Sequence, residues 1–359
     1  MALKHNPVKL AIVGGGAAGM FAAAVAAERR VPCVLIERKA RLGSKVLMTA
    51  NGRCNFTKDI SAEQFLADVG EARGFVAAAI RACPPRQIIS GFKSLNVPLR
   101  RMADGRMFPA DGKAATIVHA FGDLLRDSEV PILTNCPVRG VERVERGNFV
   151  LHTRNFDLLA ENVLIATGGV SYPKTGSVGD GQNFAKALGH RLVPYQPGLI
   201  GLETTDRKVT SLAGRRFEDG RAKVIGPDGA TLFDYRGEID CESFGLSGAA
   251  VYNAQRFVEH WRREDVRRKT EDLRIEAWFG HNRLQFKGLK PRPVKEAIVT
   301  IGGVATDEID PRTMESKLVP HLYFAGEVMD IDGPTGGYNL TLAFATARLA
   351  VTSVGRVGR

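Results

Sequence analysis

The sequence predicts an α/β protein in which one domain of alternating strands and helices is interrupted by a smaller, β-rich insertion. Three segments support this prediction: a strand, glycine turn and helix at residues 9–30, a strand and glycine turn at 161–169, and a strand, two glycine turns and a helix at 321–350. From residue 199 to 250 the pattern changes to short alternating stretches separated by turn signals. We therefore expect residues 1–195 and 297–359 to form the first domain and residues 196–296 to form the insertion.

The first segment, "KLAIVGGGAAGMFAAAVAAERRVPCVLIE", carries the most specific motif. Gly14, Gly16 and Gly19 have G-x-G-x-x-G spacing between a buried strand and an alanine-rich helix that we expect to end near Arg30. The first glycine makes a tight turn, the second lets a pyrophosphate approach the backbone, and the third allows close packing of helix on strand. Glu37 ends the next strand, where an acid accepts the hydrogens of a ribose diol. The segment therefore predicts a dinucleotide-binding Rossmann domain.

Two later segments indicate which dinucleotide is bound. "ENVLIATGG" (161–169) is a strand that opens into Thr167 and Gly168, and the C-terminal segment has a strand, a Gly326-Glu327 turn and a helix beginning around Tyr338. This order is typical of two-dinucleotide-type FAD proteins, in which the positive end of the last helix points at the flavin. FAD is the predicted cofactor. Since the chain has one full G-x-G-x-x-G, an NAD(P)H donor would use a shallow site.

Bulk composition excludes several other classes. The 359-residue chain has no stretch of 18 apolar residues, and its five cysteines are odd in number and scattered, which is typical of reduced thiols in a cytoplasm. Neither cysteines nor histidines show metal-ligand spacing, so we expect no metal site. The formal charge of +11 favours a phosphate-bearing partner, but no basic tail or block is present. An arginine-rich composition without functional meaning explains the charge equally well.

Four long segments resemble the BaiN/YhiN-like flavoproteins, described as aminoacetone-oxidase-like or NAD(P)/FAD-dependent oxidoreductases. These segments are "ARLGSKVLMTANGRCNFT" (40–57), "GRMFPADGKAATIV" (105–118), "ATGGVSYPKTGSVGDGQNFAKALGH" (166–190) and the stretch from 300 to 350. The resemblance implies an FAD domain interrupted by a β-rich substrate domain. The family's "LFTH-x-G-x-SGP" signature reads "IDCESFGLSGAA" at 239–250, and the connection from Gly248 to Phe286 is shorter than usual. The resemblance therefore implies a reduced helical cap.

The resemblance also implies which residues surround the cofactor. Around the ADP half it places Gly14, Gly16, Ala18, Gly19, Glu37, Arg38 and, through its backbone, Val138. The loop that wraps the isoalloxazine would contain Lys45, Asn51, Gly52, Arg53, Cys54 and Asn55. From the other side Gly326, Glu327, Gly337, Tyr338, Asn339 and Leu340 would close over the flavin.

Members of this family are linked to amine oxidation, to reduction of conjugated double bonds in rings, and to reduction of uridine to dihydrouridine in ribosomal RNA. The reductive cases share one scheme: hydride passes to an electron-poor carbon, a donor stabilises the enolate, and an acid protonates the neighbouring carbon. We expect an NAD(P)H-driven reductase of this kind, with uridine in ribosomal RNA as a candidate substrate. The alternatives are an amine oxidase of the aminoacetone type and an RNA-binding or structural flavoprotein without turnover.

Four residues are candidates for the catalytic chemistry, and each has a structural alternative. Cys54 is either the acid or a small residue in a tight turn. Arg53 and Lys45 either stabilise charge near the cofactor or are solvated loop cations, and Tyr338 either donates a proton or packs against the ring. The segment "SYPKTGSVGDG" could line the mouth of the site through Tyr172, Lys174, Ser177 and Asp180, and Asp180 could equally cap the following helix.

The insertion supplies the remaining indications. We expect a helix over 250–275 and core positions for Trp261 and Trp278. Scattered basic residues favour contact with ribosomal RNA, namely Arg215, Arg216, Arg262, Arg263, Arg267, Arg268, Lys287 and Lys290.

Overall fold

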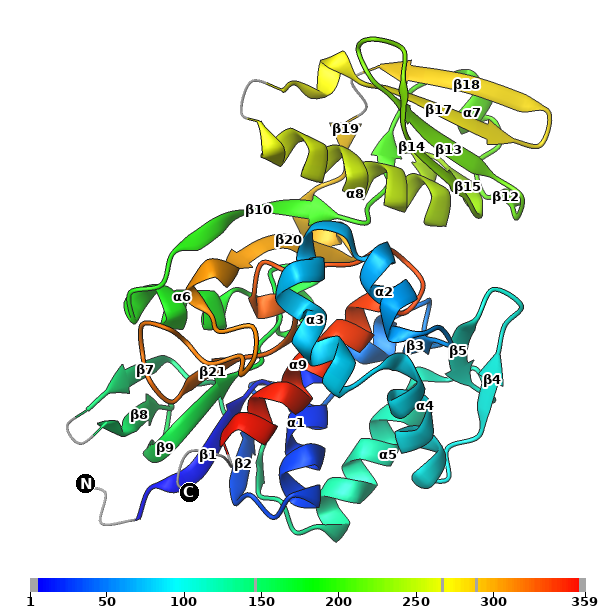
Figure 1. Ribbon diagram of the computed structural model, residues 1–359. Coiled ribbons are helices and arrows are strands. Elements are labelled where there is room, and N and C mark those ends of the chain that lie inside the picture. The colour runs from blue at the N-terminus through cyan, green and yellow to red at the C-terminus, as the bar shows by residue number, and fades with distance from the viewer. Residues whose placement is uncertain (1–5, 145–146, 266–267, 288–289, 355–359) are drawn as a thin grey trace. The chain divides into compact units, whose positions relative to one another are not determined.

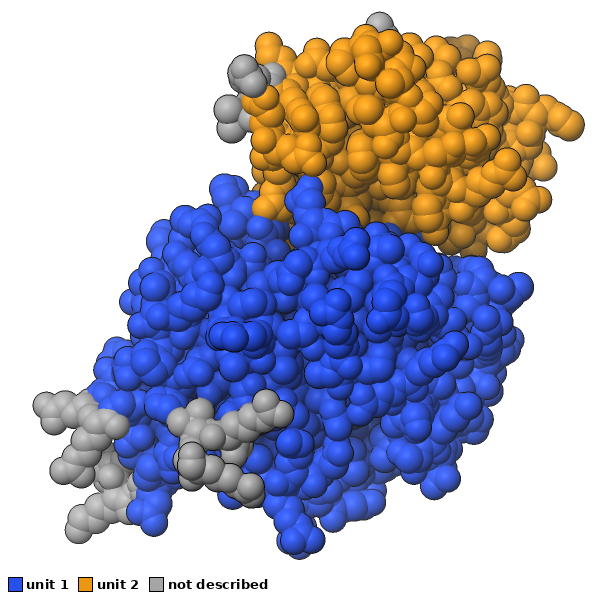
Figure 2. Space-filling view, viewed as in Figure 1, with its two compact units in different colours: residues 1–194, 302–359 blue, residues 195–301 orange. Residues whose placement is uncertain are grey.

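The computed structural model describes residues 6–144, 147–265, 268–287 and 290–354 (Figure 1). The chain divides into two compact units, which Figure 2 distinguishes by colour. Unit 1 comprises residues 1–194 and 302–359, and unit 2 comprises residues 195–301.

Unit 1 is built on a mixed sheet with the strand order β6-β2-β1-β9-β8-β7, with β21 beside β9 (Figure 1). The strands are β1 Val8–Val13, β2 Cys33–Ile36, β6 Ile132–Leu133, β7 Gly140–Arg143, β8 Phe149–His152, β9 Asp157–Ile165 and β21 Leu322–Phe324. β6, β2, β1, β9 and β21 run parallel, whereas β7 and β8 are antiparallel additions at one edge. The strands predicted before the three glycine turns, and the Rossmann-type fold class, are confirmed.

The register aligns the carboxyl ends of these parallel strands. Val13 of β1 lies opposite Ile36 of β2 and Ile165 of β9, and Phe324 of β21 also lies opposite Ile165. The loops that follow the four strands therefore begin at one edge of the sheet. In open α/β sheets this edge is where ligands bind.

Helices cover the sheet of unit 1 and a small satellite sheet. The helices are α1 Ala17–Glu28, α2 Ala62–Asp68, α3 Arg73–Ala82, α4 Pro85–Ser94, α5 Ala114–Asp127, α6 Asp180–Ala187 and α9 Tyr338–Val354. The satellite sheet has the order β3-β5-β4, with β3 Thr57–Lys58, β4 Leu99–Arg101 and β5 Arg106–Pro109. Phe21 of α1 stacks on Phe344 of α9 (4.9 Å between centroids) and meets Phe121 of α5 edge-on (6.2 Å). These contacts bury the alanine-rich α1 against the C-terminal helix.

Unit 2 contains two antiparallel sheets and one long helix, α8 Ala249–Glu264, among its described residues. The five-stranded sheet has the order β12-β15-β16-β11-β19, with β11 Leu202–Glu203, β12 Arg216–Phe217, β15 Ile239–Glu242, β16 Gly245–Ser247 and β19 Lys290–Pro291. The four-stranded sheet has the order β14-β13-β17-β18, with β13 Arg221–Ile225, β14 Thr231–Arg236, β17 Arg274–Phe279 and β18 Asn282–Lys287. β10 Leu192–Gly198 pairs with β20 Val299–Val304 where the chain enters and leaves the insertion, and α7 spans Arg207–Thr210.

The helix predicted over residues 250–275 is wrong at its C-terminal end. α8 ends at Glu264, and β17 begins at Arg274 and pairs with both β13 and β18. β17 is mostly buried and turns at Gly280 into β18, in which the described side chains alternate between buried and more exposed positions, so cross-strand pairing determines the conformation of this segment.

Short 3₁₀ turns complete the described structure: η1 Val46–Met48, η2 Gly70–Ala72, η4 Pro173–Thr175, η5 Thr270–Asp272, η6 Val294–Glu296, η7 Thr306–Glu308 and η8 Gly326–Val328.

The closest approach of α1 to the glycine turn yields a stability prediction. A Cβ on Gly19 would lie 1.7 Å from the carbonyl oxygen of Gly14, so Gly19→Ala must push the helix away from the strand. We expect it to lower the free energy of unfolding by about 1–3 kcal/mol, measured by chemical denaturation. Gly74→Ala in α3 is the control, because its Cβ would meet no atom within 4 Å and helix propensity predicts a gain of up to about 1 kcal/mol. Equal stability of both variants would contradict the packing described.

Candidate cofactor site

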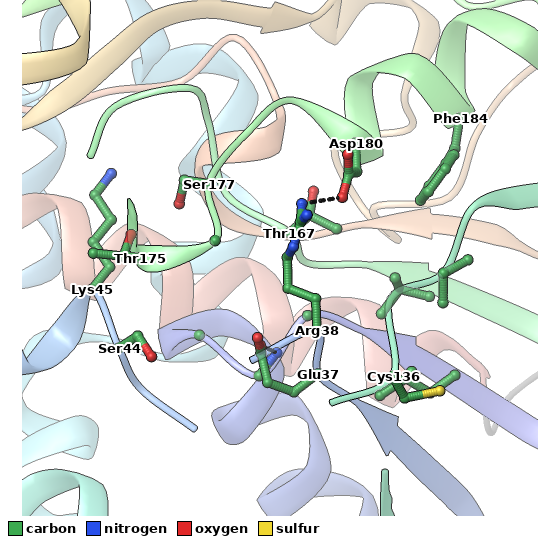
Figure 3. Close-up of a pocket in the computed structure, with 17 residues that line it drawn as sticks. Glu37, Arg38, Ser44, Lys45, Cys136, Thr167, Thr175, Ser177, Asp180 and Phe184 are labelled. Atoms are coloured by element: carbon green, nitrogen blue, oxygen red, sulfur yellow. Dashed lines mark hydrogen bonds and ion pairs between the residues drawn. The ribbon is translucent and has the colours of Figure 1, made fainter. Parts of the chain in front are cut away.

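The loops that follow the parallel strands line a cleft at the carboxyl edge of the sheet (Figure 3). Its walls come from the ends of β1, β2 and β9, from the segment after β6, and from the start of α6. Lining residues named by the sequence analysis are Gly14, Gly16, Glu37, Arg38, Lys45, Val138, Thr167, Ser177 and Asp180.

The glycine turn opens the cleft to the N-terminus of α1. Gly14 has φ +110°, and its N–H donates to the carbonyl of Ile36 at 2.8 Å, which holds the turn against β2. Gly16 is the N-cap of α1 and contributes no side-chain cap, and a Cβ placed on it would meet no atom within 4 Å. An uncapped helix N-terminus beside open space fits an anionic group such as a pyrophosphate.

Glu37 forms a fixed acidic group on the cleft wall. The residue is 8% exposed, and its carboxylate accepts hydrogen bonds from the N–H of Gly15 (2.7 Å) and of Lys39 (2.6 Å). Burial raises the pKa of Glu37, and those two hydrogen bonds oppose the rise. The position and orientation of this carboxylate fit an acceptor for ribose hydroxyls.

Arg38 and Asp180 form an ion pair in the same cleft, drawn as a dashed line in Figure 3. Arg38 Nη1 lies 2.6 Å from Asp180 Oδ2, and each side chain is about one-third exposed. α6 begins at Asp180 with Gly179 as its N-cap and has no side-chain cap. The interpretation of Asp180 as a helix cap is therefore wrong, and its carboxylate belongs to the cleft.

Lys45 is held by a polar cluster that the sequence analysis did not predict. Its Nζ lies 2.8 Å and 3.0 Å from the two carboxylate oxygens of Glu327 and 2.6 Å from Ser171 Oγ. The Lys45 and Glu327 side chains are each 21% exposed, so Lys45 is not a solvated loop cation. Ser171 could have been suspected only from its place just after the glycine turn that follows β9.

Cys54 lies inside the protein rather than at the cleft surface. The residue is 0% exposed, has φ +56°, and burial raises the pKa of its thiol to about 12. Because protein atoms enclose the sulfur, no ligand can contact it in this conformation. The structure thus favours the interpretation of Cys54 as a small residue in a tight turn.

The rest of this loop is divided between solvent and the core. Asn51 and Arg53 are exposed, and the Arg53 guanidinium lies 5.7 Å from the centre of the Phe108 ring. Asn55 is half-buried, and with its amide oxygen facing the Gly337 N–H (3.1 Å) its NH₂ group donates to the carbonyls of Thr57 and Met107. Asn55 therefore fastens the loop to the segment that precedes α9.

Tyr338 begins α9 and is packed and partnered. It is 3% exposed, its hydroxyl donates a short hydrogen bond to Asp68, and Lys58 Nζ approaches the same oxygen at 3.4 Å. Its ring lies against Phe65 with 4.9 Å between centroids. The sequence analysis named neither Asp68 nor Lys58, which lie about 270 and 280 residues away along the chain.

The other predicted residues have mixed positions. Thr167 lines the cleft, and its enclosed Oγ1 has no hydrogen-bond partner among the described residues. Ala18 and Gly19 are buried in α1, Gly52 is half-buried in the loop of Cys54, and Gly168 has φ +76° in the turn after β9. Gly326 donates to Thr346 Oγ1 (3.0 Å), Asn339 bonds the backbone of Gly333, and Leu340 is half-buried.

Many basic residues of the insertion are already partnered. Arg216 makes two hydrogen bonds to Asp240, Arg262 pairs with Glu259, and Arg268 pairs with Glu264 while lying over Trp261. Arg215 lies over the Phe217 ring, and Arg263 has interactions of its own. Arg267 lies outside the described residues, and the side chain of Lys287 is likewise not described.

Two features are absent from the described residues: a helix that could span a membrane and a cluster of metal-ligating side chains. No helix there is long and apolar enough to cross a membrane. Among the same residues no three His, Cys, Asp or Glu side chains are grouped so that they could hold a metal ion.

The parallel sheet, the glycine turn at an uncapped helix and the acid after β2 define a Rossmann-type dinucleotide-binding protein. The family that its sequence matches makes it a flavoprotein oxidoreductase whose dinucleotide is FAD. The chain belongs to the family described as "HI0933-like protein Rossmann domain", which matches residues 8–353. The resemblance to the BaiN/YhiN-like flavoproteins is thereby confirmed.

Similar proteins span nearly the whole chain. The 3-dehydro-bile acid delta(4,6)-reductase of Clostridium scindens is 28% identical, over 95% of this chain and 98% of its own length. The ribosomal RNA dihydrouridine synthase of Escherichia coli is also 28% identical, over 94% of this chain and 95% of its own length. Among solved structures, the 3-ketosteroid-delta4-(5alpha)-dehydrogenase of Rhodococcus jostii shares the fold, with a TM-score of 0.57, 15% identity and coverage of 97% and 96% of the two chains.

The open space at Gly16 predicts a selective loss of cofactor. The methyl group of Gly16→Ala would meet no protein atom within 4 Å, so we expect the fold to persist. It would lie where we expect the pyrophosphate to approach the N-terminus of α1. FAD binding should weaken by about tenfold, which corresponds to about 1.4 kcal/mol. Titration of the apoprotein with FAD measures the affinity, and the far-UV spectrum controls for folding. An unchanged affinity would show that the phosphates do not pass Gly16.

The burial of Cys54 predicts an unreactive thiol. With a pKa of about 12, this thiol is protonated at pH 8 and should resist a disulfide reagent until the protein unfolds. Cys54→Ala should therefore leave the number of thiols that react in the native protein unchanged and remove one in denaturant. The variant should also retain FAD and the rate of flavin reduction. Loss of reduction with FAD still bound would instead make Cys54 a catalytic residue.

Proposed function

We propose that the protein is an NAD(P)H-dependent reductase that saturates a ring C=C bond conjugated to a carbonyl, and that its substrate is uridine in ribosomal RNA. The observation that carries this proposal is the pair of full-length relatives, a bile acid reductase and a ribosomal RNA dihydrouridine synthase. Both names denote addition of hydrogen across a ring double bond. Their alignments cover about 95% of this chain, so they include both units.

The charge of the protein supports the RNA substrate over a small one. A formal charge of +11 and a pI near 9.6 attract a polyanion, and this attraction depends on salt. A bile acid carries a single carboxylate and gains little from such a field. RNA bases, in contrast, come with a phosphate at every nucleotide.

The cofactor is assigned to the cleft through residues that fit its parts. Gly14 and Gly16 would let the pyrophosphate approach α1, Glu37 would accept the ribose hydroxyls, and Val138 would border the adenine. When bound there, FAD supplies a carrier that takes a hydride from NAD(P)H and gives it to the substrate. With one dinucleotide fold in the chain, the nicotinamide donor would use an open surface of the flavin site.

The charged residues near the cleft suggest distinct roles. Lys45 is a cation that lines the cleft, and its ammonium would offset negative charge that develops on the cofactor. Arg53 is exposed and is the better candidate for gripping a substrate phosphate or carbonyl. The hydroxyl of Tyr338 donates a hydrogen bond to Asp68, so we assign Tyr338 the positioning of α9 rather than proton donation to a substrate.

An anaerobic reduction experiment tests the proposal. NADPH or NADH should bleach the visible absorbance of the flavin, and ribosomal RNA with unmodified uridine should restore it faster than air does. Mass spectrometry of the RNA should show a gain of two hydrogens on a uridine. RNA in which the target uridines are already reduced is the control and should leave the flavin bleached.

Three outcomes would contradict parts of the proposal. Reoxidation by a cyclic enone but not by RNA would reject the RNA substrate. Rapid peroxide formation in air, with reduction by aminoacetone, would identify an amine oxidase instead. Absence of bleaching with either nucleotide would reject NAD(P)H as the donor.

A further inference from the structure

The four-stranded sheet of unit 2 has one apolar face and one basic face. Ala222 and Val224 of β13 and Ile275, Ala277 and Phe279 of β17 are buried in the core of unit 2. Leu284 and Phe286 of β18 pair with Ala277 and Ile275 and are buried in the same core. Since side chains alternate along a strand, the residues between them lie on the opposite face. α8 lies along the core side of this sheet in Figure 1 and packs on β13 and β14.

Trp278 lies on the second face, contrary to the core position expected for it. It pairs in register with Arg221 on β13 and with Arg283 on β18, and it is half-buried. Trp261, in contrast, does pack against the core of unit 2, as the sequence analysis predicted. The indole of Trp278 is therefore a large aromatic surface on the polar side of the sheet.

Cations surround this indole. Arg221, Lys223 and Arg283 place their charged groups 5.8, 5.6 and 5.2 Å from the ring of Trp278. Such distances allow cation–π attraction, which holds the side chains beside the ring. Proteins that bind single-stranded nucleic acids use such an arrangement: a base stacks on the aromatic ring, and cationic side chains beside it contact the phosphates.

The same face has a surplus of positive charge. Strand alternation adds Arg236 of β14 and Arg274 of β17 to the three cations, and the face contains two carboxylates, Asp234 and Glu276. Among the side chains that the structure describes, five cations against two carboxylates leave three positive charges on this face. We call the face formed by these seven charged residues and Trp278 the Trp278 face.

Glu276 is recessed, Asp234 is exposed but paired with Arg221, and some cations extend into solvent. Glu276 is 5% exposed and accepts hydrogen bonds from Gln285 (2.7 Å) and Arg283 (3.3 Å). Asp234 takes two hydrogen bonds from Arg221, the first at 2.7 Å. The Arg283 side chain remains 60% exposed, and Arg236 is exposed as well. An approaching anion therefore meets the guanidinium groups of Arg283 and Arg236 before it meets Glu276, while Arg221 offsets the charge of Asp234.

We propose that the Trp278 face binds a single-stranded segment of RNA, with one base stacked on the Trp278 indole and adjacent phosphates contacted by Arg283 and Arg236. This inference rests on the proposed function, because it supplies the RNA substrate with a contact outside the cofactor cleft. An acidic protein surface would match the charge as well, and Trp and Arg are also enriched in protein–protein interfaces, but the RNA substrate of the proposed function is a polyanion that carries bases. Base stacking accounts for the ring and the charge together.

The chain has only two tryptophans, which permits a direct test. In a Trp261→Phe protein, Trp278 is the remaining tryptophan, and stacking of a base should quench its fluorescence. We expect a short oligouridylate to quench the emission saturably and its affinity to fall as salt rises. Heparin, a polyanion without bases, should compete for the face but should not reproduce the quenching. Absence of quenching by the oligouridylate would overturn the proposal.

Substitutions on the face separate stacking from charge. Trp278→Ala should weaken oligouridylate binding by about 5- to 150-fold, whereas Trp278→Phe should retain most of it. Arg283→Gln should weaken binding about uniformly across RNA sequences and reduce the salt slope by about one.

Arg207 is an exposed arginine of α7 outside this sheet, so Arg207→Gln is the matched control and should change the affinity for RNA much less. Retained FAD absorbance and far-UV spectra show that each variant folds, and equal losses for Arg283→Gln and Arg207→Gln would reject the face as the site.

These binding measurements distinguish the inference from the proposed function. Fluorescence quenching measures RNA binding and requires no turnover. It therefore tests the RNA-binding face even if the protein never reduces RNA. If RNA is reduced and Trp278→Ala leaves its KM unchanged, the inference is wrong and the proposed function stands. If oligouridylate binds as described and no uridine is reduced, the proposed function is wrong and the RNA-binding face stands.

Discussion

The structure of unit 1 depends on the register that brings the carboxyl ends of four parallel strands to one level. Val13, Ile36, Ile165 and Phe324 lie side by side, so the residues that follow them meet although they are widely separated along the chain. The uncapped N-terminus of α1, the carboxylate of Glu37 and the Lys45–Glu327 pair all take their positions from this alignment. A slip of one residue in any of the four strands would turn every side chain of that strand to the other face and dismantle the cleft.

Sequence patterns predict this part of the fold well because their causes are local. A glycine turn between a buried strand and a helix has few stable conformations, and an acid at the end of the next strand follows from the same geometry. The strands, the start of α9 at Tyr338 and the α/β class were predictable for this reason. The contacts of Ser171 with Lys45 and of Asp68 with Tyr338 were not, because each joins polar residues more than a hundred positions apart. Nothing in the local sequence of serine or aspartate indicates such a partner.

Two further differences arise from tertiary context. Residues 261–272 have mixed charges at helical spacing, yet α8 ends at Glu264. From Arg274 on, β17 pairs with strands on both edges, and this pairing overrides the local helical pattern. The positions of Cys54 and Trp278 could not be deduced because depth is a property of the packed molecule. The loop position of Cys54 suggested a reactive thiol, but the packed protein encloses it. The apolar character of Trp278 suggested a core position, but the alternation of side chains along β17 places it on the polar face of the sheet.

The position of α9 has a consequence for synthesis on the ribosome. This last helix packs on α1, and β21 completes the sheet beside β9, so the N-terminal segment cannot bury its apolar surface until the end of the chain emerges. The insertion of residues 195–301 is translated in between, which takes on the order of ten seconds at about 5–20 residues per second. Throughout that interval the growing chain presents an incomplete sheet edge and an uncovered alanine-rich helix. Nascent unit 1 is therefore a natural client for the chaperones that shield such surfaces, whereas unit 2 has all its strands in one continuous segment and can fold as soon as it is made.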